Sequence, residues 1–121
     1  MSSKLITGTI GFAPDLNASI VNFNLMVDPE THKVNGSVQI QVNPPEEKPY
    51  SGNVTGTVYA TGYGEYVQVI AIQGTIPSNN LLTPINFPFN AHMALKADGS
   101  GVGGFNFRGQ HLEDQPVTTK S

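Results

Sequence analysis

Glycines at a fixed place in a two-residue alternation most constrain the fold of this chain. The pattern apolar-x-Gly-x-apolar recurs around Gly8, Gly36, Gly56 and Gly74, and each glycine shares the apolar face of a predicted strand. Glycine weakens a strand unless space is needed there, so such a position indicates a bend at a barrel corner or a large neighbour packed over the missing side chain. Several glycines in phase therefore favour a closed sheet.

Alternating apolar and polar residues predict strands along most of the chain. The predicted strands cover residues 6–12, 21–27, 34–42, 53–61, 66–76, 89–97 and 103–107, with a last short strand near 116–119. No window has the capped 3.6-residue apolar period of an amphipathic helix. We therefore expect an all-β fold with little or no helix.

Seven or eight consecutive antiparallel strands joined by short loops are typical of a small up-and-down barrel, with a two-sheet β-sandwich as the alternative. The chain has 121 residues, which suffice for one hydrophobic core and are too few for two. We expect a single domain over residues 1–121, with mobile ends at about 1–3 and 118–121.

Charge and cysteine content exclude several classes of function. The net charge is −3, and the six Lys and Arg residues are scattered singly. Binding to nucleic acid through phosphates needs clustered basic residues, so we expect no nucleic-acid partner. Charged residues make up only 12% of the chain. The chain has no cysteine, so a thiolate nucleophile and a cysteine zinc site are excluded.

The apolar segments are short. The longest, residues 69–72, is far below the ~20 residues of a membrane-spanning helix, and residues 1–11 lack the apolar run of a signal peptide. We expect a soluble cytoplasmic protein with no membrane span, leaderless export being the alternative.

The segment 66–76 is apolar on both faces, so it is either central or covered by another subunit. We expect a homo-oligomer, most simply a dimer, and a non-catalytic binding or self-assembling module that acts through protein–protein contacts. Nearby tyrosines suit a rim for a carbohydrate or a protein partner. The candidate ligand or interface residues are Tyr59, Tyr63, Tyr66, Val67, Val69 and His92.

Two other classes of function make different demands on the sequence. A carrier of a small apolar ligand would need space in the barrel lumen, which inward glycines could leave and Phe12, Phe23, Phe105 and Phe107 could fill. An enzyme would need titratable groups held together in a dry pocket. Since the histidines and most carboxylates fall in turns or at outward positions, we expect no enzymatic activity.

The polar loop that Asp28-Pro29 opens holds the weak metal candidates Asp28, Glu30 and His32. Carboxylates and an imidazole can bind a divalent metal, but only with a further ligand that converges in space. Turn chemistry accounts for all three residues, so we expect no metal and no other cofactor. Similarly, the glycine-rich segment 98–104 predicts a hairpin rather than a phosphate loop, because no helix or Lys-Ser/Thr pair follows it.

Two resemblances to known families add to these observations. Residues 5–10, Leu-Ile-Thr-Gly-Thr-Ile, resemble the strand openings of avidin and streptavidin, eight-stranded barrels whose biotin site is walled by tryptophans. This chain has no tryptophan, so the resemblance supports the barrel and not biotin binding. Lys-Val-Asn-Gly at 33–36, followed by Asn-Pro-Pro at 43–45, is similar to an uncharacterised family of small bacterial all-β domains. That similarity implies the fold and carries no active residues.

Overall fold

The computed structural model describes residues 4–11, 20–28, 30–41, 50–60, 64, 66–77 and 85–120. Within these ranges the protein is all-β, with no helical residue. None of the described segments forms a helix long and apolar enough to cross a membrane. The strands are β1 (Lys4–Ile10), β2 (Ile20–Asp28), β3 (Lys33–Gln41), β4 (Tyr50–Ala60), β5 (Tyr66–Pro77), β6 (Asn86–Lys96), β7 (Gly101–Phe107) and β8 (Gln110–Lys120).

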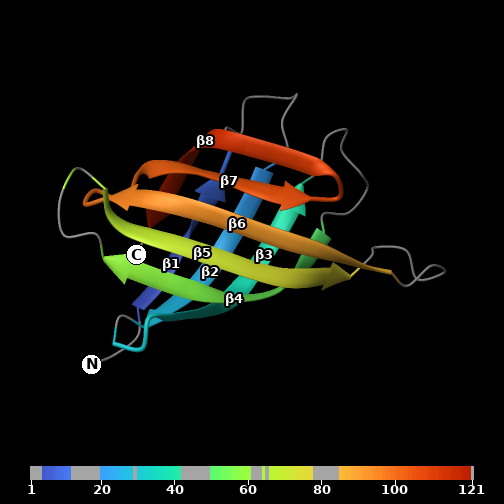
Figure 1. Ribbon diagram of the computed structural model, residues 1–121, viewed down its shortest axis with the longest axis horizontal. Coiled ribbons are helices and arrows are strands. Elements are labelled where there is room, and N and C mark those ends of the chain that lie inside the picture. The colour runs from blue at the N-terminus through green and yellow to red at the C-terminus, as the bar shows by residue number, and fades with distance from the viewer. Residues whose placement is uncertain are drawn as a thin grey trace.

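The eight strands form a closed barrel in which each strand pairs antiparallel with the next. Pairing of β1 with β8, from Thr7 opposite Lys120 to Ile10 opposite Val117, closes the sheet. In Figure 1 the strands β5, β6 and β7 pass in front of β1 and β2 at a steep angle. The up-and-down barrel is therefore confirmed over the β-sandwich.

Several strand boundaries differ from the predicted ones. The final strand was predicted near 116–119 but begins at Gln110, because a β-bulge between β7 and β8 breaks its two-residue period. β4 and β6 likewise begin earlier than predicted, within segments expected to be loops. Thr118 and Thr119, expected at a mobile end, pair with β1. Phe12 and the predicted strand end at Val42 lie outside the described residues.

Inward-facing side chains of all eight strands form one hydrophobic core. Phe23, Phe105 and Phe107 are buried in it, as the alternation predicts. At one end of the barrel the core is aromatic. The Tyr50 and Phe107 rings meet edge to face with centroids 5.2 Å apart, and Arg108 donates a hydrogen bond to the Tyr50 hydroxyl (2.5 Å). Side chains thus occupy the lumen along the described strands.

The mid-strand glycines face inward, as predicted, but they leave space for backbone rather than for a bulky side chain. A Cβ built on Gly56 would meet the Ala71 carbonyl oxygen and would lie 2.8 Å from Ile72 Cα. A Cβ on Gly36 would similarly meet the carbonyl of Asn24. Adjacent strands therefore approach too closely at these positions for any residue but glycine, as expected where a small barrel curves.

The glycines Gly52 and Gly56 of β4 give a matched test of this close approach. A Cβ at Gly56 collides with backbone, whereas one at Gly52 first meets Ile76 Cδ1 (2.8 Å), the end of a rotatable side chain. We expect Gly56→Ala to lower the free energy of unfolding by about 1–3 kcal/mol, and Gly52→Ala to cost clearly less. Urea unfolding at constant m-value measures both. An unchanged or higher midpoint for Gly56→Ala would contradict the close approach.

Candidate functional site

An apolar row crosses the outside of the barrel from β4 to β8. Tyr59 pairs with Val69, Val69 with Ala94, Ala94 with Val102, and Val102 with Pro116. We call these five residues the outer band. Tyr59 is 55% exposed and Val69 36%, while Ala94 and Val102 are half-buried. The register thus aligns five apolar side chains, one from each of five neighbouring strands, on a surface that faces solvent.

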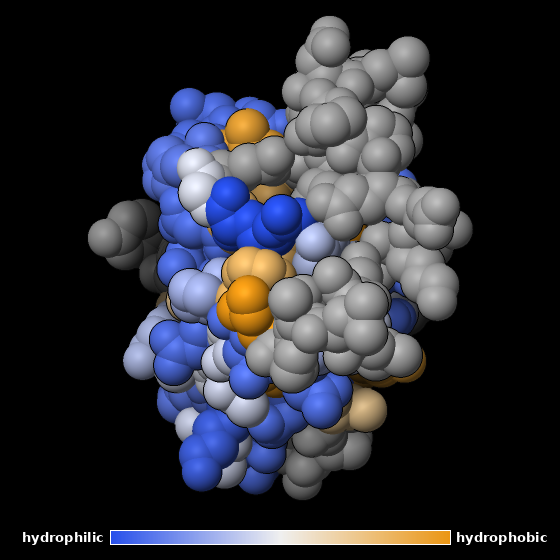
Figure 2. All heavy atoms as spheres, turned by 90° about the vertical axis from the view of Figure 1, so that its right-hand side faces the viewer, coloured by the Kyte–Doolittle hydropathy of each residue, from blue (hydrophilic) through white to orange (hydrophobic). Residues whose placement is uncertain are grey.

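On β5 the surroundings of the outer band are uncharged. The outward positions of β5 are Val67, Val69, Ala71, Gln73 and Thr75, none of which is charged. By contrast, Figure 2, which looks at the side where β5 and β7 end, shows a described surface that is mainly hydrophilic with a small hydrophobic area. Contiguous exposed apolar surface is uncommon on a monomer and marks an interaction site.

A hollow of about 320 Å³ lies beside the outer band, over β4, β5 and β6. Its lining includes Gly56, the short outward side chain of Ala71, and the polar side chains of Gln73, Asn90 and His92. The hollow and the protruding Tyr59 are on the same outer face. An apolar ring with a polar tip could occupy this hollow, because Gln73, Asn90 and His92 offer partners for a hydroxyl group.

His92 borders the hollow and bridges two non-adjacent strands. Its Nε2 lies 3.2 Å from Glu113 Oε1 on β8, across the intervening β7. A Cβ at Gly104 would come within 2.5 Å of that Glu113 oxygen, so the glycine leaves room for the contact. The β-bulge that places Glu113 there includes Asp114, with a φ of 55°. The exposed pair thus forms a polar edge to the apolar surface.

Tyr59 is held by the turn between β2 and β3. Its ring stacks on the His32 imidazole, with centroids 5.5 Å apart and planes inclined by 23°. The His32 Nδ1–H donates to the Val58 carbonyl (3.0 Å), which fixes the orientation of the imidazole. This anchoring lowers the conformational freedom of an exposed aromatic side chain, as suits a residue that contacts a partner.

The weak metal candidates have other roles. The Asp28 carboxylate accepts hydrogen bonds from the backbone N–H of Glu30 (3.0 Å) and of Thr31 (3.4 Å), which hold its pKa below the usual range. His32 is engaged with Val58 and Tyr59. Over the described ranges no three His, Asp or Glu side chains come together as a metal site would require.

The hairpin predicted at the glycine-rich segment is confirmed. Asp98 accepts hydrogen bonds from the Ser100 hydroxyl (2.7 Å) and from its backbone N–H (2.9 Å), and Gly99 has a φ of 92°. The turn joins β6 to β7 rather than a strand to a helix, so it lacks the helix N-terminus of a phosphate loop.

A family model matches residues 5–111 and is described as a domain of unknown function, DUF1842. The chain belongs to the DUF1842 family. The match confirms the resemblance to an uncharacterised domain family. No curated protein matches the chain.

Sequence reasoning identified part of the outer face of this DUF1842 domain. Val67 and Val69 are exposed on β5, as expected, and His92 faces outward on β6. Tyr66 is half-buried, with Lys96 Nζ 5.8 Å from its ring centroid, and Tyr63 lies outside the described residues. The contributions of β7 and β8 to the band were missed because they depend on strand register, which the alternation alone does not define.

The Asp98 turn makes stability depend on pH. The Ser100 hydroxyl and then its backbone N–H lower the pKa of Asp98, so the stabilisation is present above the unfolded value of about 3.9 and is lost as pH falls through the folded value. We therefore expect Asp98→Asn to show a smaller loss of stability between neutral and acid pH than the natural protein. Ser100→Ala, which removes one donor, should lie between the two. Thermal unfolding across this range measures the effect, and parallel curves for all three proteins would contradict it.

Proposed function

We propose that this DUF1842 domain is a non-catalytic module that associates with a second copy of itself through the outer band. The observation that carries the proposal is the alignment of Tyr59, Val69, Ala94, Val102 and Pro116 in one cross-strand row on the solvent side. Burial of such a row removes apolar surface from water, which is the main driving force of association.

The chemistry of this face favours a second copy as the occupant. The outward positions of β4 and β5 on this face are uncharged, so two identical faces can meet there without burying unpaired ions. In a twofold interface each contact occurs twice, and here a protruding Tyr59 and a hollow lie on the same face. Tyr59 of each copy would enter the hollow of the other.

The area required is compatible with the size of the molecule. A stable interface buries about 800 Å² on each partner, whereas the accessible surface of the chain is 7231 Å². Five strands contribute to the outer band, and the His92–Glu113 pair would lie at its rim, where polar groups keep contact with water. An interface of standard size would therefore cover about a tenth of the molecule's surface.

The non-catalytic part of the proposal rests on how the described titratable groups are used. Asp28 and Asp98 accept hydrogen bonds within their own turns, and His32 is bonded to a backbone carbonyl. His92 and Glu113 meet each other on an exposed surface rather than in a dry pocket. General acid–base catalysis needs such groups positioned toward a shared substrate site.

Matched lysine substitutions test self-association. Val69→Lys places a charge within the outer band, whereas Met26→Lys makes a similar change at an exposed residue of β2 (44% exposed) outside it. We expect a dimer of the 12.9 kDa chain, weakened about tenfold or more by Val69→Lys because the lysine is buried without a partner. Met26→Lys should leave the dimer unchanged. Sedimentation equilibrium over a concentration series measures the dissociation constants.

A natural chain that stays monomeric throughout the concentration series would overturn the proposal. Equal weakening by both lysine variants would overturn the placement of the interface, because it would show a general charge effect. Circular dichroism confirms that each variant retains its β structure before the comparison is made.

A further inference from the structure

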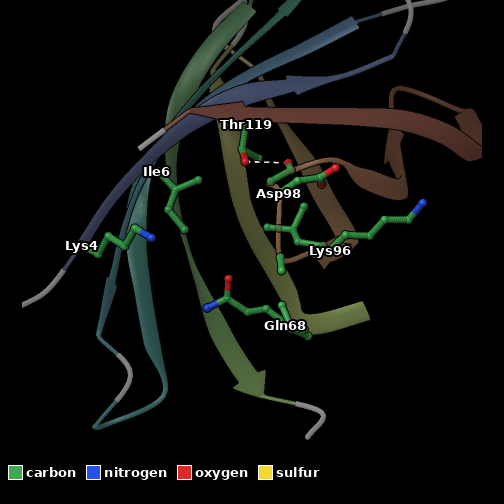
Figure 3. Close-up of a pocket in the computed structure, with 10 residues that line it drawn as sticks. Lys4, Ile6, Gln68, Lys96, Asp98 and Thr119 are labelled. Carbon is green, nitrogen blue, oxygen red and sulfur yellow. Dashed lines mark hydrogen bonds between the residues drawn. The ribbon is translucent and has the colours of Figure 1, made fainter. Parts of the chain in front are cut away.

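The barrel has a small pocket at the end where β1 and β5 begin and β6 and β8 end. The pocket has a volume of about 210 Å³. Ile6 and Leu95, both buried, form its apolar part, and Lys4, Gln68 and Thr119 line it with polar groups (Figure 3). It is separate from the hollow beside the outer band and shares no lining residue with it.

Two polar residues of this pocket occupy strand positions that, by the two-residue alternation, face the barrel interior. Lys4 has the same parity as Ile6 on β1, and Gln68 has the same parity as Ile70 on β5. Figure 3 shows the Lys4 ammonium and the Gln68 carboxamide directed into the pocket from opposite walls. Lys4 is exposed and Gln68 is half-buried, so both polar groups are accessible to a molecule that enters the pocket from solvent.

The lining holds two cations, Lys4 and Lys96, and one carboxylate, Asp98, and its formal charge of +1 favours an anion. Asp98 lies close enough to Lys96 for their opposite charges to attract each other. The Lys96 side chain extends away from the pocket in Figure 3, and its ammonium lies near the Tyr66 ring. Among the described residues Lys4 forms no salt bridge, so its charge faces the pocket without a counter-ion from this part of the chain.

We infer that this pocket binds a small organic carboxylate with an apolar body. The carboxylate would accept hydrogen bonds from the Lys4 ammonium and the Gln68 amide N–H, and the apolar body would contact Ile6 and Leu95. One cation and one neutral donor match a single negative charge better than a phosphate dianion, which is usually held by several cations or backbone N–H groups.

The size of the pocket limits the ligand. A cavity of about 150 Å³ holds benzene, and drug-sized ligands occupy about 300–1,000 Å³. With about 210 Å³, the pocket suits a single aromatic ring or a short aliphatic chain that carries the carboxylate. Benzoate is therefore a suitable probe, and benzyl alcohol is its neutral counterpart of similar shape.

Titration of the natural protein with benzoate, followed by two-dimensional amide NMR, tests this inference. We expect saturable shifts in the millimolar range or below that are largest for residues around Ile6, Gln68 and Leu95. Lys4→Met should weaken benzoate about tenfold or more, since it removes a charge-assisted hydrogen bond and keeps an apolar stem. Lys33→Met, which removes the same charge from an exposed position outside the pocket, should have no such effect.

A second variant separates the two donors. Gln68→Leu should weaken benzoate and leave benzyl alcohol unaffected or improved, because it exchanges a polar group for an apolar one. Benzoate and benzyl alcohol binding equally to the natural protein would overturn the carboxylate site, as would equal losses in Lys4→Met and Lys33→Met. Failure of benzoate to bind at all would also reject it. Val69 does not line the pocket. Benzoate binding can therefore be measured in Val69→Lys, which separates the outcome for the pocket from the outcome for self-association.

Discussion

The structure depends on the close approach of neighbouring backbones inside a small closed sheet. Gly36 and Gly56 each bring a Cα against the backbone of an adjacent strand, where a Cβ would overlap a carbonyl oxygen. Larger residues face them across the register: Gly36 pairs with Leu25 and Val54, and Gly56 with Val34 and Ile72. Glycine thus permits the curvature, and the apolar partners fill the interior that it creates. The pairing of inward glycines with larger apolar residues therefore allows both the closure of the eight-stranded barrel and the packing of its core.

The same interior changes character along the barrel axis. One end is aromatic and is covered by Arg108, whose guanidinium lies 5.0 Å from the Tyr50 ring centroid and bonds to its hydroxyl. The middle is aliphatic, and the opposite end carries Lys4 and Gln68 at inward positions. An eight-stranded barrel has room for either packed side chains or one small ligand. Along the described strands the lumen holds side chains, and the ligand site that we infer lies at the polar end.

The strand alternation was sufficient to predict the fold because one face of every strand is buried, and a shift by one residue would expose the whole core. It also predicted that β5 is apolar on both faces, since exposed Val69 and Ala71 alternate with buried Ile70 and Ile72. It did not predict the extent of β8, since the bulge at Glu113 and Asp114 places consecutive residues out of phase. Nor did it reveal the outer band, because cross-strand partners depend on register. Lys4 and Gln68 were detectable from parity alone, as polar residues in line with Ile6 and Ile70.

Closure also determines how the domain can associate. Closure gives each described strand a neighbour on both sides, so outward side chains rather than a free edge strand are the main surface for association. The outward hollow lies over the same stretch of β4 and β5 where Gly56 lets the two backbones approach. Its lining therefore includes the inward-facing Gly56 together with the short outward side chain of Ala71. The residue that permits closure on the inside thus also contributes to the surface that we propose as an interface on the outside.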